Sequence, residues 1–582
     1  MNFWKTFLAA FLAFVVFSFV SFFLMFTIIG ALSAEETVTV SKNSVLHLKL
    51  DAEFTEQQVD NPFEGLPIPG ADVQTVGLLK LKESLTHAKT DPSIEGIYLN
   101  ISMPLAGFAV LEEVRNSLID FRAEGKWIVA YADVMSEQAY YVASAADKVY
   151  LNPEGEVELN GLNVEITFFK RLFDKLEIKP EIFRVGDYKS AVEPFLLDKM
   201  SAENRTQLTE LINSIYDYVL QGIGESRNLE KARLREISDK MLVKNAGDAV
   251  EYGLVDSLLY YDGVLSELRN RLGLGETEKI NFIRLNRYSK SMKPRKYSKN
   301  EIAVIVAEGT ILPGTGTEGV VGGDAFAEEI RKARLSNKVK AIVIRINSPG
   351  GAFQASDAMW REVTLAAKEK PVIASMSGVA ASGGYYLAMA CDTIVAQPHT
   401  ITGSIGVFTT LFDASAFLGN KLGITFDEVR TGEYGSMLGF TRPLSDAERR
   451  VWQRRTEDIY ETFTSKAAAG RDMPVEDLKK VASGRVWSGI QAKERGLVDI
   501  LGGYNDAIRI AADAAVLEDY SVKLYPRRKP FIEQLLGQLS ENARVSTLKK
   551  ELGADYVLYQ QWQQVRQMNG IQARMPFELM IR

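Results

Sequence analysis

The stretch AIVIRI at residues 341–346 decides the fold, because a related stretch, GIYLNI at residues 96–101, lies 245 residues earlier. The alignment continues without a gap to Gly161 and Gly406 and contains fourteen identical pairs. Ordinary residue usage predicts only about four identities by chance over such a length. The chain therefore contains two copies of one domain.

Strand and helix patterns alternate within the second copy. Apolar runs of strand type cover residues 341–347, 371–377 and 392–396, while residues 353–368 and 382–390 have helical spacing. A strand, a crossover helix and a second strand predict a parallel sheet that is buried on both faces. Each copy is expected to be an α/β domain.

Composition excludes several classes of function. The chain has 582 residues and a net charge of -7, so its charge does not favour nucleic acid as a partner. One cysteine, Cys391, excludes an intrachain disulfide framework. The three histidines, His47, His87 and His399, form no metal-binding motif, so we predict neither a metal nor another cofactor. A Ser-His-Asp triad needs only one histidine, which keeps His399 open as an alternative.

The N-terminal segment has no charged residue between Lys5 and Glu35. Residues 6–32 can cross a hydrocarbon layer of about 30 Å as a helix. The alternative is a cleaved signal peptide, but a cleavable apolar region normally has only about 7 to 15 residues. We therefore predict a retained anchor, with Lys5 favouring a cytoplasmic N-terminus and the bulk of the chain outside the cytoplasm.

We predict five regions along the chain. They are a membrane anchor (1–40), a first repeat (41–278), a basic linker (279–300), a second repeat (301–525) and a C-terminal tail (526–582). Residues 279–299 contain eight Lys or Arg residues and no acid after Lys279, which favours a solvated linker over a contact with anionic lipid. The tail is either an assembly arm or a helical cover for a core.

The two copies differ where the first strand ends. The second copy has NSPGG at residues 347–351, where Gly350 and Gly351 leave backbone N–H groups accessible, and the first copy has SMPLA. The second copy also has AASGGYY at residues 380–386, which places Ser382 and Gly383 at a helix start that favours developing negative charge. A serine there is either a helix cap or a nucleophile.

A base for Ser382 comes from the same comparison. With one extra residue of offset, GDYKS at residues 186–190 aligns with GEYGS at residues 432–436, so Lys189 aligns with Gly435. The copy without the serine has the lysine, and the copy without the lysine has the serine. This complementary loss indicates one site shared between the copies, although a lysine is by default a solvated surface residue.

AASGGYY, NSPGG, TGSIGV and GDYKSAVEPF, in a chain with an N-terminal anchor, resemble signal peptide peptidase A (protease IV) of the long, duplicated bacterial type. The resemblance implies tandem Clp protease/crotonase-like α/β domains and a Ser-Lys dyad that hydrolyses peptides. By position, Ser382 is the expected nucleophile, Lys189 the general base and Ser404 the hydroxyl that orients the lysine. The N–H groups of Gly351 and Gly383 are expected to hold the oxyanion, next to the turn at Gly350.

The resemblance also implies the partners. Substrates are expected to be hydrophobic signal peptides left in a bacterial inner membrane after cleavage, with the catalytic part on the periplasmic side and the anchor in lipid. A homo-oligomer is expected, a tetramer being one candidate, and the dyad could form within a chain or between chains. Two alternatives stay open: a crotonase-type acyl-CoA enzyme, which needs neither Ser382 nor Lys189, and a non-catalytic membrane scaffold.

Overall fold

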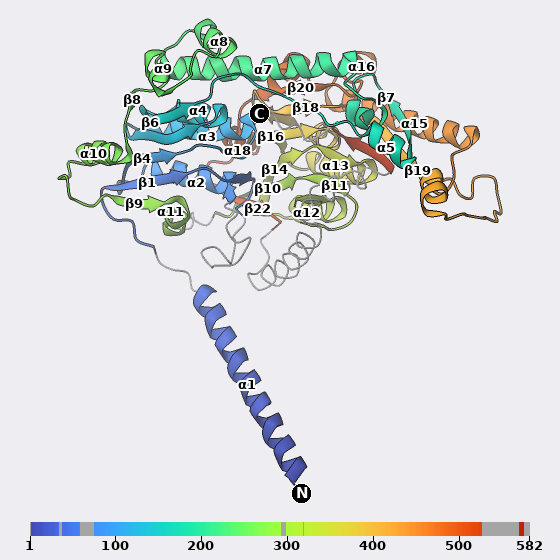
Figure 1. The fold of residues 1–582 in the computed structure, drawn as a ribbon, viewed down its shortest axis with the longest axis horizontal. Helices are drawn as coiled ribbons and strands as arrows, with labels where there is room; N and C mark the ends of the chain where they lie inside the picture. Colours follow the sequence, from blue (N-terminus) through green and yellow to red (C-terminus); the bar gives the residue numbers. More distant parts are fainter. Residues whose placement is uncertain are drawn as a thin grey trace.

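The computed structural model describes residues 2–33, 38–58, 75–292, 298–317, 319–526 and 570–575. Within these residues, each repeat is centred on its own sheet, and the two sheets lie next to each other in Figure 1. The first sheet has the order β8–β6–β5–β4–β1–β9, and its neighbouring strands run parallel. Its strands are β1 (Ser44–Lys49), β4 (Ile94–Asn100), β5 (Trp127–Met135), β6 (Lys148–Val157), β8 (Ser257–Leu258) and β9 (Asn281–Arg284).

The second sheet has the order β20–β18–β16–β14–β10–β22, with β17 and β21 on a branch beside β16. Its central strand β14 has apolar residues on both faces, because one face packs under helices of the second repeat and the other against α18 (Tyr504–Ala514). The strands are β10 (Glu301–Glu308), β14 (Val339–Ser348), β16 (Val372–Ala381), β17 (Thr393–Ala396), β18 (Ile401–Gly403), β20 (Val486–Ser488), β21 (Ile500–Leu501) and β22 (Ser521–Tyr525).

The predicted alternation of elements is confirmed. In the second repeat β14, α13 (Phe353–Ala367), β16, α14 (Gly383–Ala388) and β17 follow one another, and β14 and β16 pair in parallel. The corresponding elements of the first repeat are β4, α3 (Phe108–Ala123), β5, α4 (Glu137–Ala143) and β6. The apolar run at residues 341–346, which only Arg345 interrupts, therefore forms a strand that is covered on both faces.

The long helix α7 (Ala202–Arg227) lies across both repeats in Figure 1. It contacts α4 of the first repeat and β20 of the second, where the hydroxyls of Ser214 and Ser488 are 2.7 Å apart. The other helices of five or more residues are α2 (Leu78–Ala88), α5 (Lys170–Leu176), α8 (Lys231–Asp239), α9 (Ala246–Glu251), α10 (Tyr261–Leu272), α11 (Leu285–Ser291), α12 (Gly323–Leu335), α15 (Asp446–Gly470), α16 (Val475–Val481) and α17 (Gly489–Glu494).

A third, mixed sheet joins the two repeats. Its order is β12–β13–β11–β15–β23–β19–β7, and β7 (Lys179–Val185) of the first repeat pairs antiparallel along its whole length with β19 (Val407–Asp413) of the second. Its other strands are β11 (Thr310–Leu312), β12 (Gly316–Thr317), β13 (Val320–Gly322), β15 (Gly350–Ala352) and β23 (Gly570–Arg574). This sheet holds the first repeat against the end of the second repeat that carries the predicted site.

A buried ionic cluster also crosses between the repeats. The guanidinium of Arg345 on β14 lies 2.8 Å from the Glu56 carboxylate and 2.7 Å from that of Glu113, which in turn pairs with Lys82. Burial opposes ionisation of Glu113, but Arg345 and Lys82 outweigh it and lower the pKa of this carboxyl to about 2. Removal of one member would leave a buried charge without a partner.

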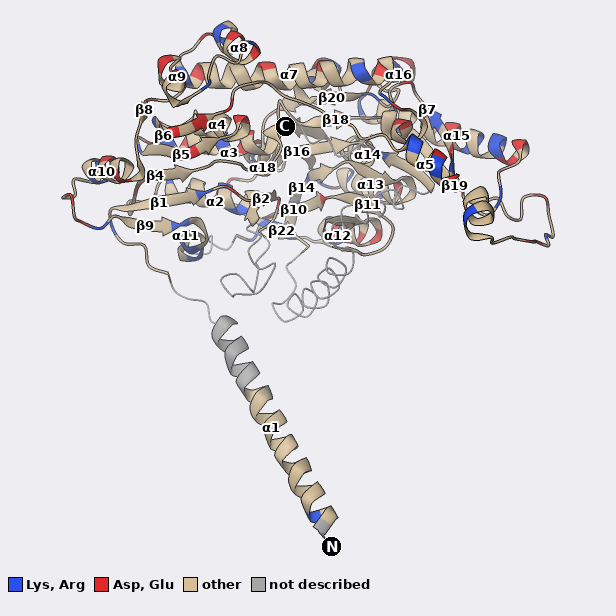
Figure 2. Ribbon diagram, viewed as in Figure 1, with Lys and Arg blue, Asp and Glu red and all other residues tan. Residues whose placement is uncertain are grey.

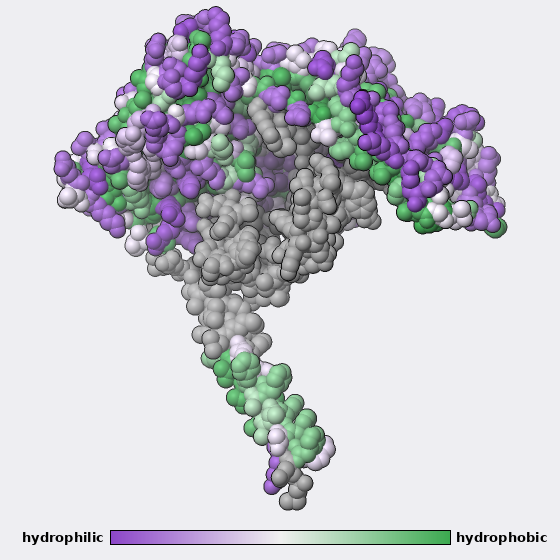
Figure 3. Space-filling view, viewed as in Figure 1, coloured by the Kyte–Doolittle hydropathy of each residue, from purple (hydrophilic) through white to green (hydrophobic). Residues whose placement is uncertain are grey.

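Helix α1 (Asn2–Ser33) extends away from the two repeats (Figure 1). The coloured part of this helix is almost without charged residues in Figure 2, and its described side chains are mostly apolar in Figure 3. By length and composition, its stretch Phe3–Ser21 could cross a membrane, and no other helix of the described residues could.

The predicted domain boundaries stay predictions. Within the expected linker, residues 281–291 form β9 and α11, and Tyr288 is buried because its hydroxyl lies between His87 and Asp91. Of the expected C-terminal tail, all but Pro526 and residues 570–575 lies outside the described residues.

Candidate active site

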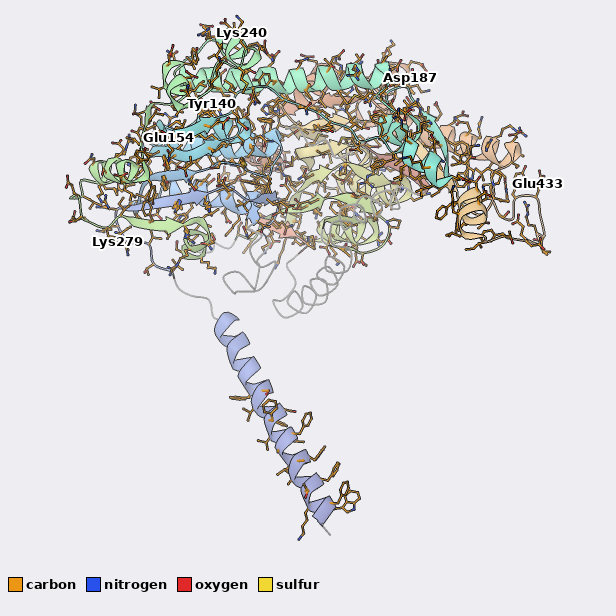
Figure 4. The ribbon with its side chains drawn as sticks, in the orientation of Figure 1. Tyr140, Glu154, Asp187, Lys240, Lys279 and Glu433 are labelled. Atoms are coloured by element: carbon orange, nitrogen blue, oxygen red, sulfur yellow. The ribbon has the colours of Figure 1, made fainter. Side chains whose placement is uncertain are left out.

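The pairing of β7 with β19 brings Lys189, a residue of the first repeat, into contact with the second repeat. Val185 at the end of β7 is opposite Val407, and the chain then turns through Gly186, where φ is +99°. The residues after Gly186 are held in place by a hydrogen bond in which the Tyr188 N–H donates to the Ser483 carbonyl over 3.1 Å. In Figure 4, Asp187 lies at the far end of α7 from Lys240 and apart from Tyr140 on α4 of the first repeat.

Lys189 and the two predicted serines meet in one chain. The Nζ atom of Lys189 lies 2.9 Å from Ser382 Oγ, 3.0 Å from Ser404 Oγ and 3.0 Å from the Ser404 carbonyl oxygen. All three side chains are fully buried. The amine is thus within proton-transfer distance of the Ser382 hydroxyl.

Burial favours the neutral form of the Lys189 amine. The pKa of Lys189 is lowered well below its usual value, and desolvation is the sole cause of this shift. The partners of Nζ are hydroxyl and carbonyl oxygens, which do not compensate a buried positive charge as a carboxylate would. The neutral amine can accept a proton near neutral pH.

Ser382 has a strained backbone. It follows the end of β16 and precedes α14 with φ 54° and ψ −110°, a conformation that is rare for a residue with a side chain. Its N–H donates to the Gly403 carbonyl over 2.9 Å, and Ser404 also has positive φ, at 49°. The sharp turn at Ser382 directs its hydroxyl toward Lys189 instead of capping α14, since Oγ makes no cap hydrogen bond to this helix.

The predicted glycines lie next to this turn. Gly350 has φ +91°, and a Cβ atom there would lie 2.5 Å from the Gly383 nitrogen. The Gly350 N–H donates to Ser348 Oγ over 3.2 Å, whereas a Cβ on Gly351 would collide with the Ile311 carbonyl. Only glycine fits at positions 350 and 351, and these residues bring the turn against the start of α14.

Sequence reasoning missed two residues that hold Lys189. The Gln207 side chain on α7 donates to the Tyr188 carbonyl over 3.1 Å and to Ser190 Oγ over 2.9 Å, and it accepts from the Val486 N–H. Gly484 packs directly on the lysine, since a Cβ there would lie 2.6 Å from Lys189 Cβ. No local pattern identifies them, because both act through contacts between distant segments.

The equivalent position in the first repeat carries no hydroxyl. Ser136 caps α4 and accepts from the Ala139 N–H, and Glu137 stands where the second repeat has Ser382. The Glu137 carboxyl accepts from the Gly161 N–H, and burial raises its pKa to about 7. The first repeat thus has a carboxyl at this position and a helix cap one residue before it.

His399 lies in the turn after β17 and packs among the rings of Phe108, Tyr141 and Tyr218. Neither ring nitrogen has a hydrogen-bond partner within the described part of the chain, and burial lowers the pKa of His399 to about 3. The structure therefore gives no support to the alternative of a triad. Among the described residues, no group of three or more His, Cys, Asp or Glu side chains is placed to hold a metal ion.

Comparisons with known proteins point to a peptidase family. The model of peptidase family S49 matches residues 120–275 and 364–518, and the Clp protease model matches residues 323–401. Serine protease SPPA of Arabidopsis thaliana chloroplasts is 37% identical over 82% of this chain and 70% of its own. Protease 4 of Haemophilus influenzae is 33% identical over 90% of this chain and 89% of its own. A putative signal peptide peptidase SppA of Enterococcus faecium is 34% identical over 33% of this chain and 58% of its own.

The fold and the relatives together define a serine peptidase built from two Clp protease-like α/β repeats. The predicted fold class is thus confirmed. The chain belongs to peptidase family S49.

Proposed function

We propose that the chain is a membrane-anchored serine endopeptidase with a Ser-Lys dyad. One observation carries the proposal: a fully buried lysine amine lies 2.9 Å from the hydroxyl of a serine on a strained turn. Ser382 is the proposed nucleophile and Lys189 its general base. Both come from the same chain, which favours a dyad within one chain over one between chains.

In the first step, the neutral Lys189 amine takes the proton of Ser382 as Oγ attacks the peptide carbonyl carbon. The carbonyl oxygen becomes an oxyanion, and the N–H groups of Gly351 and Gly383 are proposed to hold it. A donor of this kind lowers the barrier by about 2.7 to 4 kcal/mol. The protonated lysine then gives its proton to the leaving amine, and the acyl-enzyme remains.

In the second step, Lys189 takes a proton from a water molecule, which attacks the acyl carbon. The protonated lysine then returns this proton to Ser382 Oγ as the bond between Oγ and the acyl carbon breaks, and the carboxylic acid product leaves. Ser404 is proposed to orient the amine in both steps. Its hydroxyl and its carbonyl are both 3.0 Å from Nζ, so the lysine side chain is held by two hydrogen bonds besides that to Ser382.

The proposed substrates are hydrophobic signal peptides that remain in the membrane after cleavage. Helix α1 supports this, because a single anchor would hold the site near the bilayer where such peptides lie. The name of the Enterococcus faecium relative also supports it. We propose a bacterial inner-membrane location with the two repeats on the periplasmic side, consistent with Lys5 at the short end of the anchor.

A homo-oligomer is also part of the proposal. Residues 421–440 project from the second repeat beyond β19 in Figure 1, and several of their apolar side chains are exposed: Leu422, Ile424, Phe426, Val429, Tyr434, Leu438 and Phe440. Apolar surface of this extent is typical of an interaction site. The mass of the purified protein in detergent, measured by light scattering, tests the state of assembly.

The test of function is loss of peptide hydrolysis in Ser382→Ala and in Lys189→Ala, with Lys240→Ala, an exposed lysine, as control. Both site variants should be inactive and folded, and the control should be fully active. Labelling of Ser382 by a fluorophosphonate would exclude a crotonase-type enzyme, which does not use this hydroxyl. Full turnover in either site variant would refute the proposed mechanism.

A further inference from the structure

Lys189 lies at the centre of a tight backbone turn. Its φ and ψ are −75° and 72°, and the Ser190 N–H donates to the Tyr188 carbonyl over 2.8 Å, which are the features of an inverse γ-turn. A turn of three residues fixes the direction in which the central side chain leaves the backbone. The place of the Lys189 amine therefore depends on what holds this turn.

The side-chain amide of Gln207 on α7 holds the turn on both sides of the lysine. Besides its bonds to the Tyr188 carbonyl and to Ser190 Oγ, Nε2 donates to Asn204 Oδ1 over 3.0 Å. The Oε1 atom of Gln207 accepts from the Val486 N–H over 3.2 Å, and only 1% of the residue is exposed. The amide thus uses its donors on the first repeat and its acceptor on the second.

Gln207 is the first of three residues on α7 that contact β20 and the residue before it. The Glu210 carboxylate pairs with the Arg485 guanidinium, and the hydroxyl of Ser214 lies beside that of Ser488. Residues three and seven positions apart lie on one face of a helix. This face of α7 therefore holds the second repeat along about two helical turns.

The same part of the second repeat holds the other proposed partner of the amine. The Arg485 carbonyl accepts from the Ser404 N–H over 2.7 Å. Gly484, one residue earlier, packs on Lys189 itself. Gln207 therefore joins the turn that carries the proposed base to the segment that holds Ser404.

We infer that Gln207 is a positioning residue: its amide fixes the turn at Lys189, so that the amine stays against Ser382 and Ser404 and away from water. The inference rests on the proposed peptidase function. None of the hydrogen bonds of Gln207 within the described part of the chain goes to either serine, so it acts through the lysine. The alternative is a purely structural role, in which the amide only attaches α7.

The start of α7 is attached by other bonds, which favours the positioning role. The Glu193 carboxylate accepts from Ser201 Oγ over 2.6 Å and from Asn204 Nδ2 over 2.9 Å. These bonds hold the first turn of the helix without Gln207. Three of the four bonds of Gln207 go instead to the turn at Lys189 and to the segment behind it.

Replacement of Gln207 by methionine keeps the length of the side chain and removes its donors and its acceptor. In Gln207→Met the turn should loosen, so that water reaches the Lys189 amine and the pKa of this amine rises toward 10.4. The expected loss of kcat is about 10²-fold, the cost of a misplacement of about 1 Å. KM should change by no more than about twofold, because a residue that acts through the lysine does not bind the substrate.

The experiment measures kcat, KM, unfolding in urea and the pH dependence of Ser382 labelling by a fluorophosphonate, with full-length chains in detergent. The chains are the wild type, Gln207→Met, Gln207→Glu and the control Gln221→Met. Gln221 lies on the exposed face of the same helix and donates to Glu225, so its replacement should leave kcat and labelling unchanged. In Gln207→Met the ionisation seen by labelling should move up by about one pH unit or more, which a loss of stability alone would not cause.

Gln207→Glu separates the donors from the size of the side chain. It keeps an acceptor for the Val486 N–H, but the ionised carboxylate has no hydrogen to donate to the Tyr188 carbonyl, so kcat should fall here too. Wild-type kcat and labelling in either folded variant would overturn the inference. Failure of both variants to fold would also overturn it, because the amide would then serve the fold as a whole.

The inference and the proposed function fail differently in these measurements. If Ser382 is labelled at the wild-type rate in Lys189→Met, the dyad itself is refuted, whatever Gln207 does. If labelling depends on Lys189 but is the same in Gln207→Met and the wild type, only the positioning role is refuted.

Discussion

Gly484→Ala should strongly lower kcat/KM without changing a catalytic group. A Cβ at this position would lie 2.6 Å from Lys189 Cβ and 2.7 Å from its Cα and N atoms. Ordinary contacts of a Cβ atom begin at 3.4 Å, so the Lys189 backbone would have to move by several tenths of an ångström. Lys189 Nζ is 2.9 Å from Ser382 Oγ, and a displacement of this order disrupts proton transfer.

The expected loss of kcat/KM is about 10²-fold, the cost associated with a misplacement of about 1 Å. Part of any effect would come from the backbone, because Gly484 has φ +78°. Gly273→Ala is the matched control, since Gly273 has φ +65° and no atom within 4 Å of a Cβ there. Both variants should lose about 1 kcal/mol of stability from this strain.

The assay is steady-state hydrolysis of a fluorogenic peptide, together with thermal unfolding of both variants. Gly484→Ala should show the loss of about 10²-fold in kcat/KM at a temperature where it is folded, and Gly273→Ala should be fully active. If Gly484→Ala hydrolysed the peptide at the wild-type rate, close packing on Lys189 would not matter for catalysis, and the argument for an enforced dyad geometry would be refuted.

Three further predictions concern charge. Arg345→Met should lower the free energy of unfolding by about 3 to 5 kcal/mol in urea titrations, because it leaves Glu56 and Glu113 buried without this partner. As a control, replacement of the half-exposed Arg331 by Met should lower it by at most about 1 kcal/mol. Lys189→Met should gain stability over the wild type as pH falls below about 10.4, by up to about 1.4 kcal/mol per pH unit, because the unfolded lysine binds a proton that the buried one does not; equal pH slopes for both chains would contradict this. His399→Ala should keep full kcat/KM at every pH, and loss of activity in this folded variant would reopen a triad.

The sequence predicts the elements of each repeat because their patterns are local. The apolar run at residues 341–346 can be buried only between two layers of helices, and the structure shows this for β14. Arg345, which interrupts that run, has no local partner, and its ionic contacts come from residues more than 200 positions away. Local patterns do not predict such contacts.

The candidate site likewise has residues that the sequence predicts and contacts between distant segments that it does not. Ser382 and Lys189 are found by comparing two related copies, since each copy lacks what the other keeps. The reason they meet is the pairing of β7 with β19, which depends on the register of two strands that are far apart in the chain. The same holds for Gln207 and Gly484, and for β23 between β15 and β19.

The most direct test of the dyad is the rate at which a fluorophosphonate labels Ser382 between pH 5 and 10. In the wild type the rate should rise with pH through one ionisation well below 10.4, the ordinary pKa of lysine, because only the neutral Lys189 amine can take the Ser382 proton. Lys189→Met should react about 10² to 10⁴ times more slowly at its plateau. Labelling of Lys189→Met at the wild-type rate, or a wild-type ionisation near 10.4, would contradict the account.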